Sequence, residues 1–433
     1  RLRRMRAVLT LSSFSIVKEY FASLSQTMRS TLPPLAALLF PVLLSAQECG
    51  TGRYTTYGYF PTIDSIPGIV FGSNIGVSGS PQTLRMDIYA PANDTLLARP
   101  VVVVAFGGSF VGGSRADMAG ICGQLARLGY VAVAVDYRVG FFLPNTNTTM
   151  HAVQRCVHDM KGAIRYLRKT VVDDGNPYAI DTDRIMVGGV SAGAIGALHL
   201  TYMNEPSELP APLVADSAVW GGMEGNSGPL GYSSDVMACF SMSGALMDTT
   251  WIQPGDQPFC GIHETGDAVV PCYTAEAYAF GFPTGIIVSG DHDLKIRMDN
   301  LAIPSCYLEY PGTDHVGYVS YDPVNSMNFV VQFLASIACD VEVDCSGAAV
   351  AVNEHTQAAD ELLLYPVPAN DAITLEMPEA ATIQILDGQG RVVVEQRLPA
   401  GQNHIATAEL SNGLYLVRTE GTTIRTARLV IAR

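Results

Sequence analysis

A serine between two glycines carries the clearest chemical signal in this sequence. Residues Gly189-Val190-Ser191-Ala192-Gly193 match the pattern G-x-S-x-G, between a predicted buried strand and a predicted helix that begins at Ala194. Small flanking residues allow a turn tight enough to lift the serine hydroxyl clear of a sheet. We therefore predict Ser191 as a nucleophile. The alternative is a glycine-rich turn in which the serine only caps the helix.

A serine nucleophile requires a general base, which we expect late in the chain. His315 follows the last predicted strand, in Pro311-Gly312-Thr313-Asp314-His315, where a loop can return over the nucleophile. Order and position favour it among the eight histidines. His263 and His292 remain alternatives.

The acid that orients the base is expected between the serine and the histidine in the chain. Asp267 lies there, in a loop after a predicted strand. Asp291 and Asp293 in the next segment are alternatives. Asp314 is disfavoured because a residue seldom reaches the imidazole of its neighbour in the required line. The order therefore predicts Asp267 as the acid.

Backbone donors for a tetrahedral oxyanion are expected near the nucleophile. The segment Phe106-Gly107-Gly108-Ser109-Phe110 directly follows a predicted buried strand. Its uncovered backbone makes Gly107, Gly108 and Ser109 candidates for an oxyanion hole, together with the amide of Ala192. A glycine turn needed only for positive φ is the alternative.

Strands and helices alternate along the segment that holds these residues. Alternating strands and helices imply parallel pairing, and therefore a doubly wound, mostly parallel α/β sheet. Such sheets carry their sites beyond the carboxyl ends of the strands. The predicted strands are 84–89, 100–105, 130–135, 184–190, 236–241, 259–263 and 306–310, and the predicted helices cover 117–128 and 153–167.

The sequence changes character after about residue 345. Residues 346–362 are small, polar and acidic, which is typical of a linker. Short alternating runs then follow over 363–433, separated by turn signals such as Asp387-Gly388 and Asn412-Gly413. We predict an α/β domain at 48–345 and a separate small all-β domain at 363–433.

The first 47 residues indicate targeting rather than fold. Met28 precedes an apolar run at 35–44, and the small residues Ser45-Ala46 follow it. This layout predicts a signal peptide. The run is interrupted by Pro41 and is too short for a bilayer core, which takes about 20 residues. An exported protein is therefore expected.

Charge and cysteine content restrict the partners and cofactors. A net charge of -15 argues against nucleic acid or an anionic membrane as a partner. The nine cysteines of an exported chain favour disulfides, and none has the paired spacing of a zinc site. Their pairing is open, and the odd number leaves at least one free thiol. No phosphate-binding glycine loop or metal-ligand cluster indicates a cofactor, so none is expected.

Over roughly residues 80–337, these segments together resemble the α/β-hydrolase esterase and lipase family. The loop at 107–110 resembles the HGGG-F oxyanion loop, and Asp136-Tyr137-Arg138 resembles the DYR after the next strand. Segments 155–167, 189–193, 266–271 and 314–315 follow in the family's order. Phe106 replaces the usual His, and Val190 stands where the best-known esterase branches carry Asp or Glu.

The resemblance implies a serine hydrolase that cleaves carboxylic esters with the predicted triad. The expected substrate is a small-molecule or polysaccharide-linked ester. A serine exopeptidase of the same fold would use the same residues, and a non-catalytic α/β-hydrolase that only binds is a third alternative.

Residues 363–433 resemble the C-terminal sorting domain of type IX secretion cargo. The matching segments are 365–369, 387–392 and 410–415, and the first departs from the usual YPNPA at Val367. The resemblance implies a β-sandwich that is recognised by the outer-membrane secretion machinery. It also implies a secreted or cell-surface protein exported through the periplasm. A carbohydrate-binding β module is the alternative.

Overall fold

The computed structural model describes residues 48–141, 143–279, 281–346, 362–387, 391–420 and 425–432. The chain divides into two compact units, Arg1–Val350 and Ala351–Arg433. The predicted signal peptide and nearly all of the predicted linker lie outside the described residues.

An eight-stranded sheet forms the centre of the first unit, in the order β1-β2-β4-β3-β5-β6-β8-β11. Its strands pair in parallel from β4 to β11, whereas β1 with β2 and β2 with β4 are antiparallel. The doubly wound, mostly parallel α/β prediction is confirmed. The strands are β1 Ile63–Ile75, β2 Pro81–Pro91, β3 Arg99–Ala105, β4 Val131–Val135, β5 Ile180–Val190, β6 Ala238–Met242, β8 Phe259–Glu264 and β11 Ser305–Tyr310.

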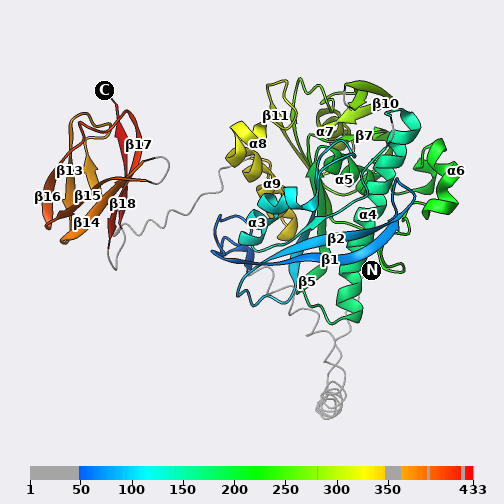
Figure 1. Cartoon of the computed structure of the whole chain (residues 1–433), viewed down its shortest axis with the longest axis horizontal. Coiled ribbons are helices and arrows are strands. Elements are labelled where there is room, and N and C mark those ends of the chain that lie inside the picture. Colours follow the sequence, from blue (N-terminus) through cyan, green and yellow to red (C-terminus); the bar gives the residue numbers. More distant parts are fainter. Residues whose placement is uncertain are drawn as a thin grey trace, which may run out of the picture. The chain divides into compact units, whose positions relative to one another are not determined.

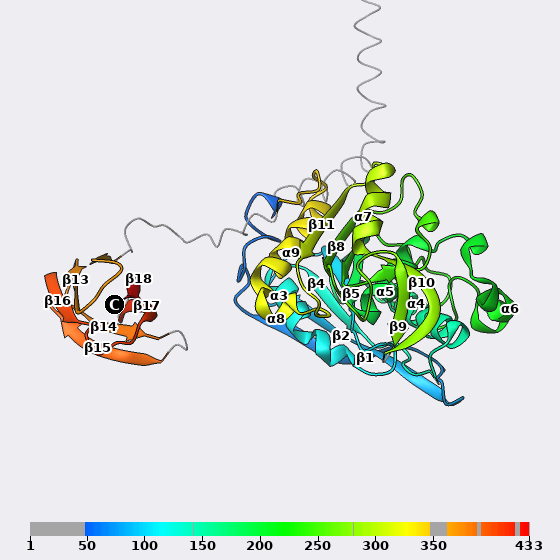
Figure 2. The same cartoon turned by 90° about the horizontal axis from the view of Figure 1, so that it is seen from above.

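Helices cover both faces of this sheet (Figures 1 and 2). Helices α3 (Ala119–Arg127) and α9 (Pro323–Ala338) lie on one side, and α4 (Thr146–Asp173) and α5 (Ala192–Tyr202) lie on the other. Every residue of β3 and β4 is consequently buried, which explains their continuous valine and alanine runs.

Smaller elements that the sequence did not predict surround this frame. They are helices α6 (Ala211–Trp220), α7 (Asp291–Asn300) and α8 (Tyr318–Tyr321), and an antiparallel sheet of β7 (Ala245–Leu246), β10 (Phe282–Gly290) and β9 (Ala275–Ala279). Within the described ranges, no helix is long and apolar enough to cross a membrane.

Two disulfides join distant parts of the first unit. Cys49 pairs with Cys339 at the end of α9, and Cys306 of β11 pairs with Cys345. The other five cysteines are free and buried. Burial raises the pKa of the Cys156 thiol well above its ordinary value, so this thiol is unreactive at neutral pH.

The second unit consists of antiparallel strands in two sheets, β12-β13-β16 and β15-β14-β17-β18. Along β13, Ile373, Leu375 and Met377 are buried, and they share one apolar core with Ile385 of β14 and Val417 of β17. The all-β prediction is confirmed. The strands are β12 Leu363–Tyr365, β13 Ala372–Met377, β14 Ala381–Leu386, β15 Val392–Leu398, β16 Gly401–Ala406, β17 Gly413–Glu420 and β18 Thr426–Ile431. Of the predicted turns, the one at 412–413 leads into β17, and Gly388 lies outside the described residues.

Candidate active site

Ser191 lies on a sharp turn between β5 and α5, at the carboxyl end of a central strand. Its backbone has φ 53° and ψ -120°, a region that is strained for any residue but glycine. The turn presses against β3, because a Cβ on Gly193 would lie 2.2 Å from the backbone oxygen of Ala105. This geometry presents the serine hydroxyl at the edge of the sheet, as a nucleophile elbow does.

The loops after β8 and β11 bring Asp267 and His315 to this serine. The His315 Nε2 atom lies 2.7 Å from Ser191 Oγ, and Nδ1 lies 2.6 Å from Asp267 Oδ2. An ionised carboxylate only accepts hydrogen bonds, so Nδ1 carries the proton and Nε2 accepts the serine hydroxyl. The three residues predicted from chain order thus form one hydrogen-bonded series.

The carboxylate of Asp267 is held by several donors. Its Oδ1 atom accepts hydrogen bonds from the backbone amides of Val269 (2.8 Å) and Val270 (3.0 Å). Burial favours the neutral acid, but hydrogen bonds from His263 and His315 outweigh it and lower the pKa of Asp267 to about 2. Asp267 is therefore ionised at neutral pH, as the partner of a protonated imidazole must be.

A second histidine, His263 of β8, lies beside Asp267. The His263 Nε2 atom lies 3.4 Å from Asp267 Oδ2 and 3.0 Å from the backbone oxygen of Val270, and Nδ1 lies 3.0 Å from Asp291 Oδ2. All three titratable side chains are fully buried. Burial lowers the pKa of His263, but hydrogen bonds to Asp267 and Asp291 raise it to about 10. Burial raises the pKa of Asp291 as well, but both ring nitrogens of His263 face acceptors, so we assign His263 as an imidazolium that compensates Asp267 and Asp291.

Sequence reasoning assigned His263 and Asp291 only as rivals of His315 and Asp267, and missed that they pair with each other. One signal could have found them: His263 ends an otherwise apolar run in β8, and a titratable residue inside such a strand needs a buried partner. Asp293, the other rival acid, accepts hydrogen bonds from Thr274 and His292 instead.

The loop at 107–110 lies against the nucleophile. A Cβ on Gly107 would lie 3.1 Å from the backbone oxygen of Val190 and 3.2 Å from Ser191 Cβ. Gly108 (φ 124°) and Ser109 (φ 52°) continue the loop in the left-handed region.

The fourth predicted oxyanion donor, Ala192, is the first residue of α5. The amides of a first helical turn have no partner within the helix. Both backbone segments predicted to bind an oxyanion therefore flank Ser191.

Aromatic packing secures the start of the glycine loop. The Tyr137 hydroxyl donates a hydrogen bond to the backbone oxygen of Phe106 (2.8 Å), and the two rings stack with centroids 4.2 Å apart. Phe106, which departs from the family pattern, thus packs on the tyrosine of the DYR-like segment.

A small apolar cavity of about 60 Å³ borders both the glycine loop and the helix of the nucleophile. Ile195, one turn after Ser191, and Phe110 of the loop both line it. The remaining lining includes Met150, Val153, Met203, Leu213, Met247 and Ile286. In the part of the chain that the structure describes, no group of three His, Cys, Asp or Glu side chains could hold a metal ion.

Two family models match the sequence. The BD-FAE family matches residues 86–219, and the secretion system C-terminal sorting domain matches residues 363–432. No curated protein matches it.

Similar solved structures include two of esterase 2 from Thermogutta terrifontis. The form phosphoramylated by tabun has 20% sequence identity and a TM-score of 0.46, and the match covers 65% of this chain and 96% of that chain. The propionate-bound form has 21% identity and a TM-score of 0.44, with 62% and 94% covered. This chain therefore combines an α/β-hydrolase fold, in which residues 86–219 match the BD-FAE family, with a C-terminal unit that matches the secretion system C-terminal sorting domain.

Proposed function

We propose that this protein is an exported serine hydrolase that cleaves carboxylic esters. The hydrogen-bonded series from Ser191 through His315 to Asp267 carries the proposal. A buried ionised acid, an oriented imidazole and a hydroxyl on a strained turn are the parts that nucleophilic acyl transfer requires.

In this mechanism Ser191 Oγ attacks the ester carbonyl while His315 Nε2 takes the hydroxyl proton. The C=O π electrons move to oxygen, and amides of the 107–109 loop and Ala192 stabilise the oxyanion. The intermediate then expels the alcohol, which receives the proton from His315. Water hydrolyses the acyl-enzyme by the same steps. Asp267 stabilises the imidazolium that forms twice in this cycle.

The apolar cavity beside the nucleophile supports an ester with a small apolar acyl group. Its volume of about 60 Å³ suits a short chain, and its lining offers little to bind a charged group. An acyl chain in this cavity would have its carbonyl near Ser191, because Phe110 and Ile195, which line the cavity, belong to the glycine loop and the helix that adjoin Ser191. The alcohol part of the ester, a small molecule or a polysaccharide hydroxyl, would lie outside this cavity.

The sorting-domain match supports export, and we propose the outer-membrane secretion machinery as the partner of the second unit. The protein would pass through the periplasm and reach the cell surface or the medium. Its ester substrate would then be extracellular.

One assay panel tests the activity: p-nitrophenyl esters of increasing acyl length beside aminoacyl p-nitroanilides. We expect hydrolysis of the short acyl esters. Cleavage of the anilides alone would instead identify an exopeptidase.

The role of Ser191 is tested with the same esters. Ser191→Ala should lose several powers of ten in kcat, whereas Ser207→Ala, at an exposed serine outside the site, should lose none. A fluorophosphonate probe should label Ser191, as peptide mapping can verify. Near-normal turnover by the Ser191 variant would refute the proposal.

A further inference from the structure

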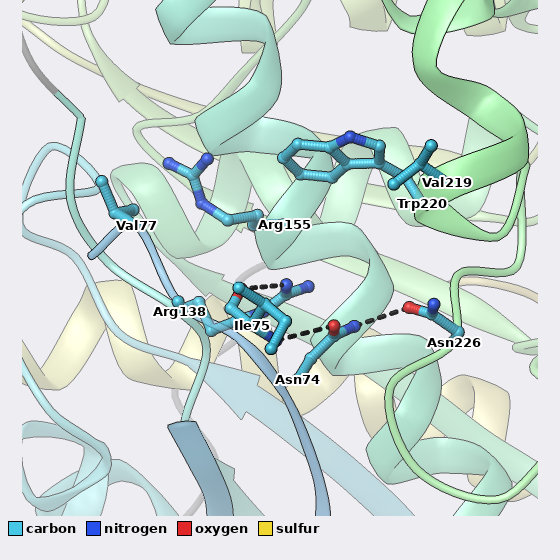
Figure 3. Close-up of a pocket in the computed structure, with 9 residues that line it drawn as sticks. Asn74, Ile75, Val77, Arg138, Arg155, Val219, Trp220 and Asn226 are labelled. Carbon is cyan, nitrogen blue, oxygen red and sulfur yellow. Dashed lines mark hydrogen bonds between the residues drawn. The ribbon is translucent and has the colours of Figure 1, made fainter. Parts of the chain in front are cut away.

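A second, larger cavity of about 420 Å³ lies beside α4, at the ends of β1 and α6 (Figure 3). Arg155 of α4 and Trp220, the last residue of α6, point into the same space. The other lining residues are Asn74, Ile75, Gly76, Val77, Arg138, Val219 and Asn226.

Arg155 is a buried cation without a counter-ion. Arg155 is only 6% exposed. Among the residues that the structure describes, no carboxylate lies within ion-pair distance of its guanidinium. Its guanidinium donates to the backbone oxygen of Gly140, while its buried Nε atom has no partner. Leaving a buried charge unpaired is costly, so this arrangement favours an anionic ligand for the cavity.

The neighbouring charges are already compensated. Arg138 forms a 2.9 Å ion pair with Asp159, and His151 lies 3.2 Å from Asp216. Burial, and next the charge of Arg138, lower the pKa of Arg155 to about 10. Arg155 therefore stays charged at neutral pH, and its charge is left available to a ligand.

Apolar side chains form much of the remaining lining. The Trp220 ring centroid lies 6.0 Å from the Arg155 guanidinium carbon, and Val77 and Val219 are 48% and 77% exposed beside it. At the opposite side, Asn74 Nδ2 donates to Asn226 Oδ1 over 2.7 Å. A half-buried indole with apolar neighbours favours a planar ring as the ligand body.

We propose that this cavity binds a small carboxylate that carries a flat ring, with the carboxylate on Arg155 and the ring against Trp220. A guanidinium fork matches a carboxylate better than any other common anion-binding group. The cavity volume lies within the range of small-molecule sites. The proposal does not depend on ester hydrolysis.

Calorimetric titration of the full-length protein with benzoate tests this site. Benzamide has the same shape without the charge, and acetate has the charge without the ring. We expect saturable binding of benzoate, and at least about tenfold weaker binding of both analogues. Equal affinity for benzoate and benzamide would overturn the proposal.

Two variants locate the binding. Arg155→Gln should weaken benzoate about tenfold or more, whereas Arg115→Gln removes the same charge outside the cavity and should have little effect. Equal losses in both would show a general charge effect and refute the site. Near-ultraviolet circular dichroism shows whether Arg155→Gln is folded. If it is not, Trp220→Leu tests the site instead, because Trp220 is only partly buried and its loss should also weaken benzoate binding. Unchanged benzoate affinity in Trp220→Leu would refute the site.

Benzoate binding in this cavity must be distinguished from benzoate binding at the active site. Protein whose Ser191 has reacted with a fluorophosphonate should bind benzoate as tightly as unreacted protein. Binding lost on this modification would place benzoate at Ser191 and overturn the proposal. If Ser191 does not react at all, the proposed hydrolase function fails. The benzoate affinities of Arg155→Gln and Arg115→Gln still test the proposed carboxylate site.

Discussion

The central strands β3 and β4 of the α/β unit are buried on both faces, whereas strand β13 of the C-terminal unit is buried on one. All residues of β3 and β4 are buried, but along β13 buried Ile373, Leu375 and Met377 alternate with more exposed residues. Side chains within a doubly covered sheet cannot reach a substrate, so reactive groups lie at strand ends. Ser191, Asp267 and His315 follow three different strands in this way.

The two cores also differ in the polar groups that they bury. The α/β unit fully buries the side chains of His263, Asp267 and Asp291, which compensate one another. In the described part of the C-terminal unit, the buried polar residues are the uncharged Gln384, Thr407 and Thr419. Buried charges are costly and are common at functional sites. The contrast predicts that chemistry belongs to the first unit and that the second serves recognition alone.

Removing the charge of the triad acid should have the largest effect. Asp267→Asn retains the shape of the side chain but loses the proper orientation and stabilisation of His315, so kcat should fall about 10⁴-fold. Steady-state hydrolysis of p-nitrophenyl acetate measures this. Asp293→Asn, at the other candidate acid, should change little, and the reverse ranking would reassign the acid.

His263→Gln should have a smaller effect on kcat, about tenfold to a hundredfold, because His263 acts on the reaction only by positioning Asp267. Its second effect is on stability. The folded-state pKa of about 10 lies above the ordinary value of 6.5. The proton on His263 therefore stabilises the fold fully below pH 6.5, and this contribution is lost as the pH rises through 10.

Urea unfolding from pH 6 to pH 10 tests this dependence. The free energy of unfolding should fall with rising pH, and less steeply in His263→Gln than in the parent. His404→Gln, on an exposed histidine of the C-terminal unit, should leave both slope and turnover unchanged. An identical slope in the parent and the His263 variant would contradict a charged His263.

The disulfide between Cys49 and Cys339 should affect stability but not chemistry. Replacing both cysteines by serine should lower the free energy of unfolding by about 2–5 kcal/mol, with kcat nearly unchanged at 25 °C. Thermal unfolding and ester assays measure the two effects. Cys272→Ser, at a free cysteine, should lower the free energy of unfolding by less. A large loss of kcat in the folded double variant would tie the site to this crosslink.

Deleting residues 351–433 should have the smallest effect on turnover, because every proposed catalytic group precedes the deletion. In the native host, the same truncation should leave the protein in the periplasm. Fractionation and ester assays check both outcomes. Normal surface delivery, with lost activity on insoluble polysaccharide, would instead favour a carbohydrate-binding module.

Elements with a strong local pattern were predictable from the sequence. The valine and alanine runs of β3 and β4 and the helical spacing of α4 identify these elements because burial imposes their periodicity. Helix α7 was missed because its sequence, DHDLKIRMDN, carries only a weak apolar stripe. Strand β10 was missed because Pro283 and Gly285 interrupt it.

The order of motifs along the chain was sufficient to predict Ser191, Asp267 and His315 as a set, because the strand order of this fold brings the ends of parallel strands to one edge. Only the tertiary structure decided which groups meet across long separations. Cys49 and Cys339 are 290 residues apart, and nothing local to either cysteine selects its partner. The same holds for the His263 pair with Asp291 and for the lone charge of Arg155. A side chain's burial and partners depend on elements packed against it from elsewhere in the chain, and local sequence patterns do not specify those contacts.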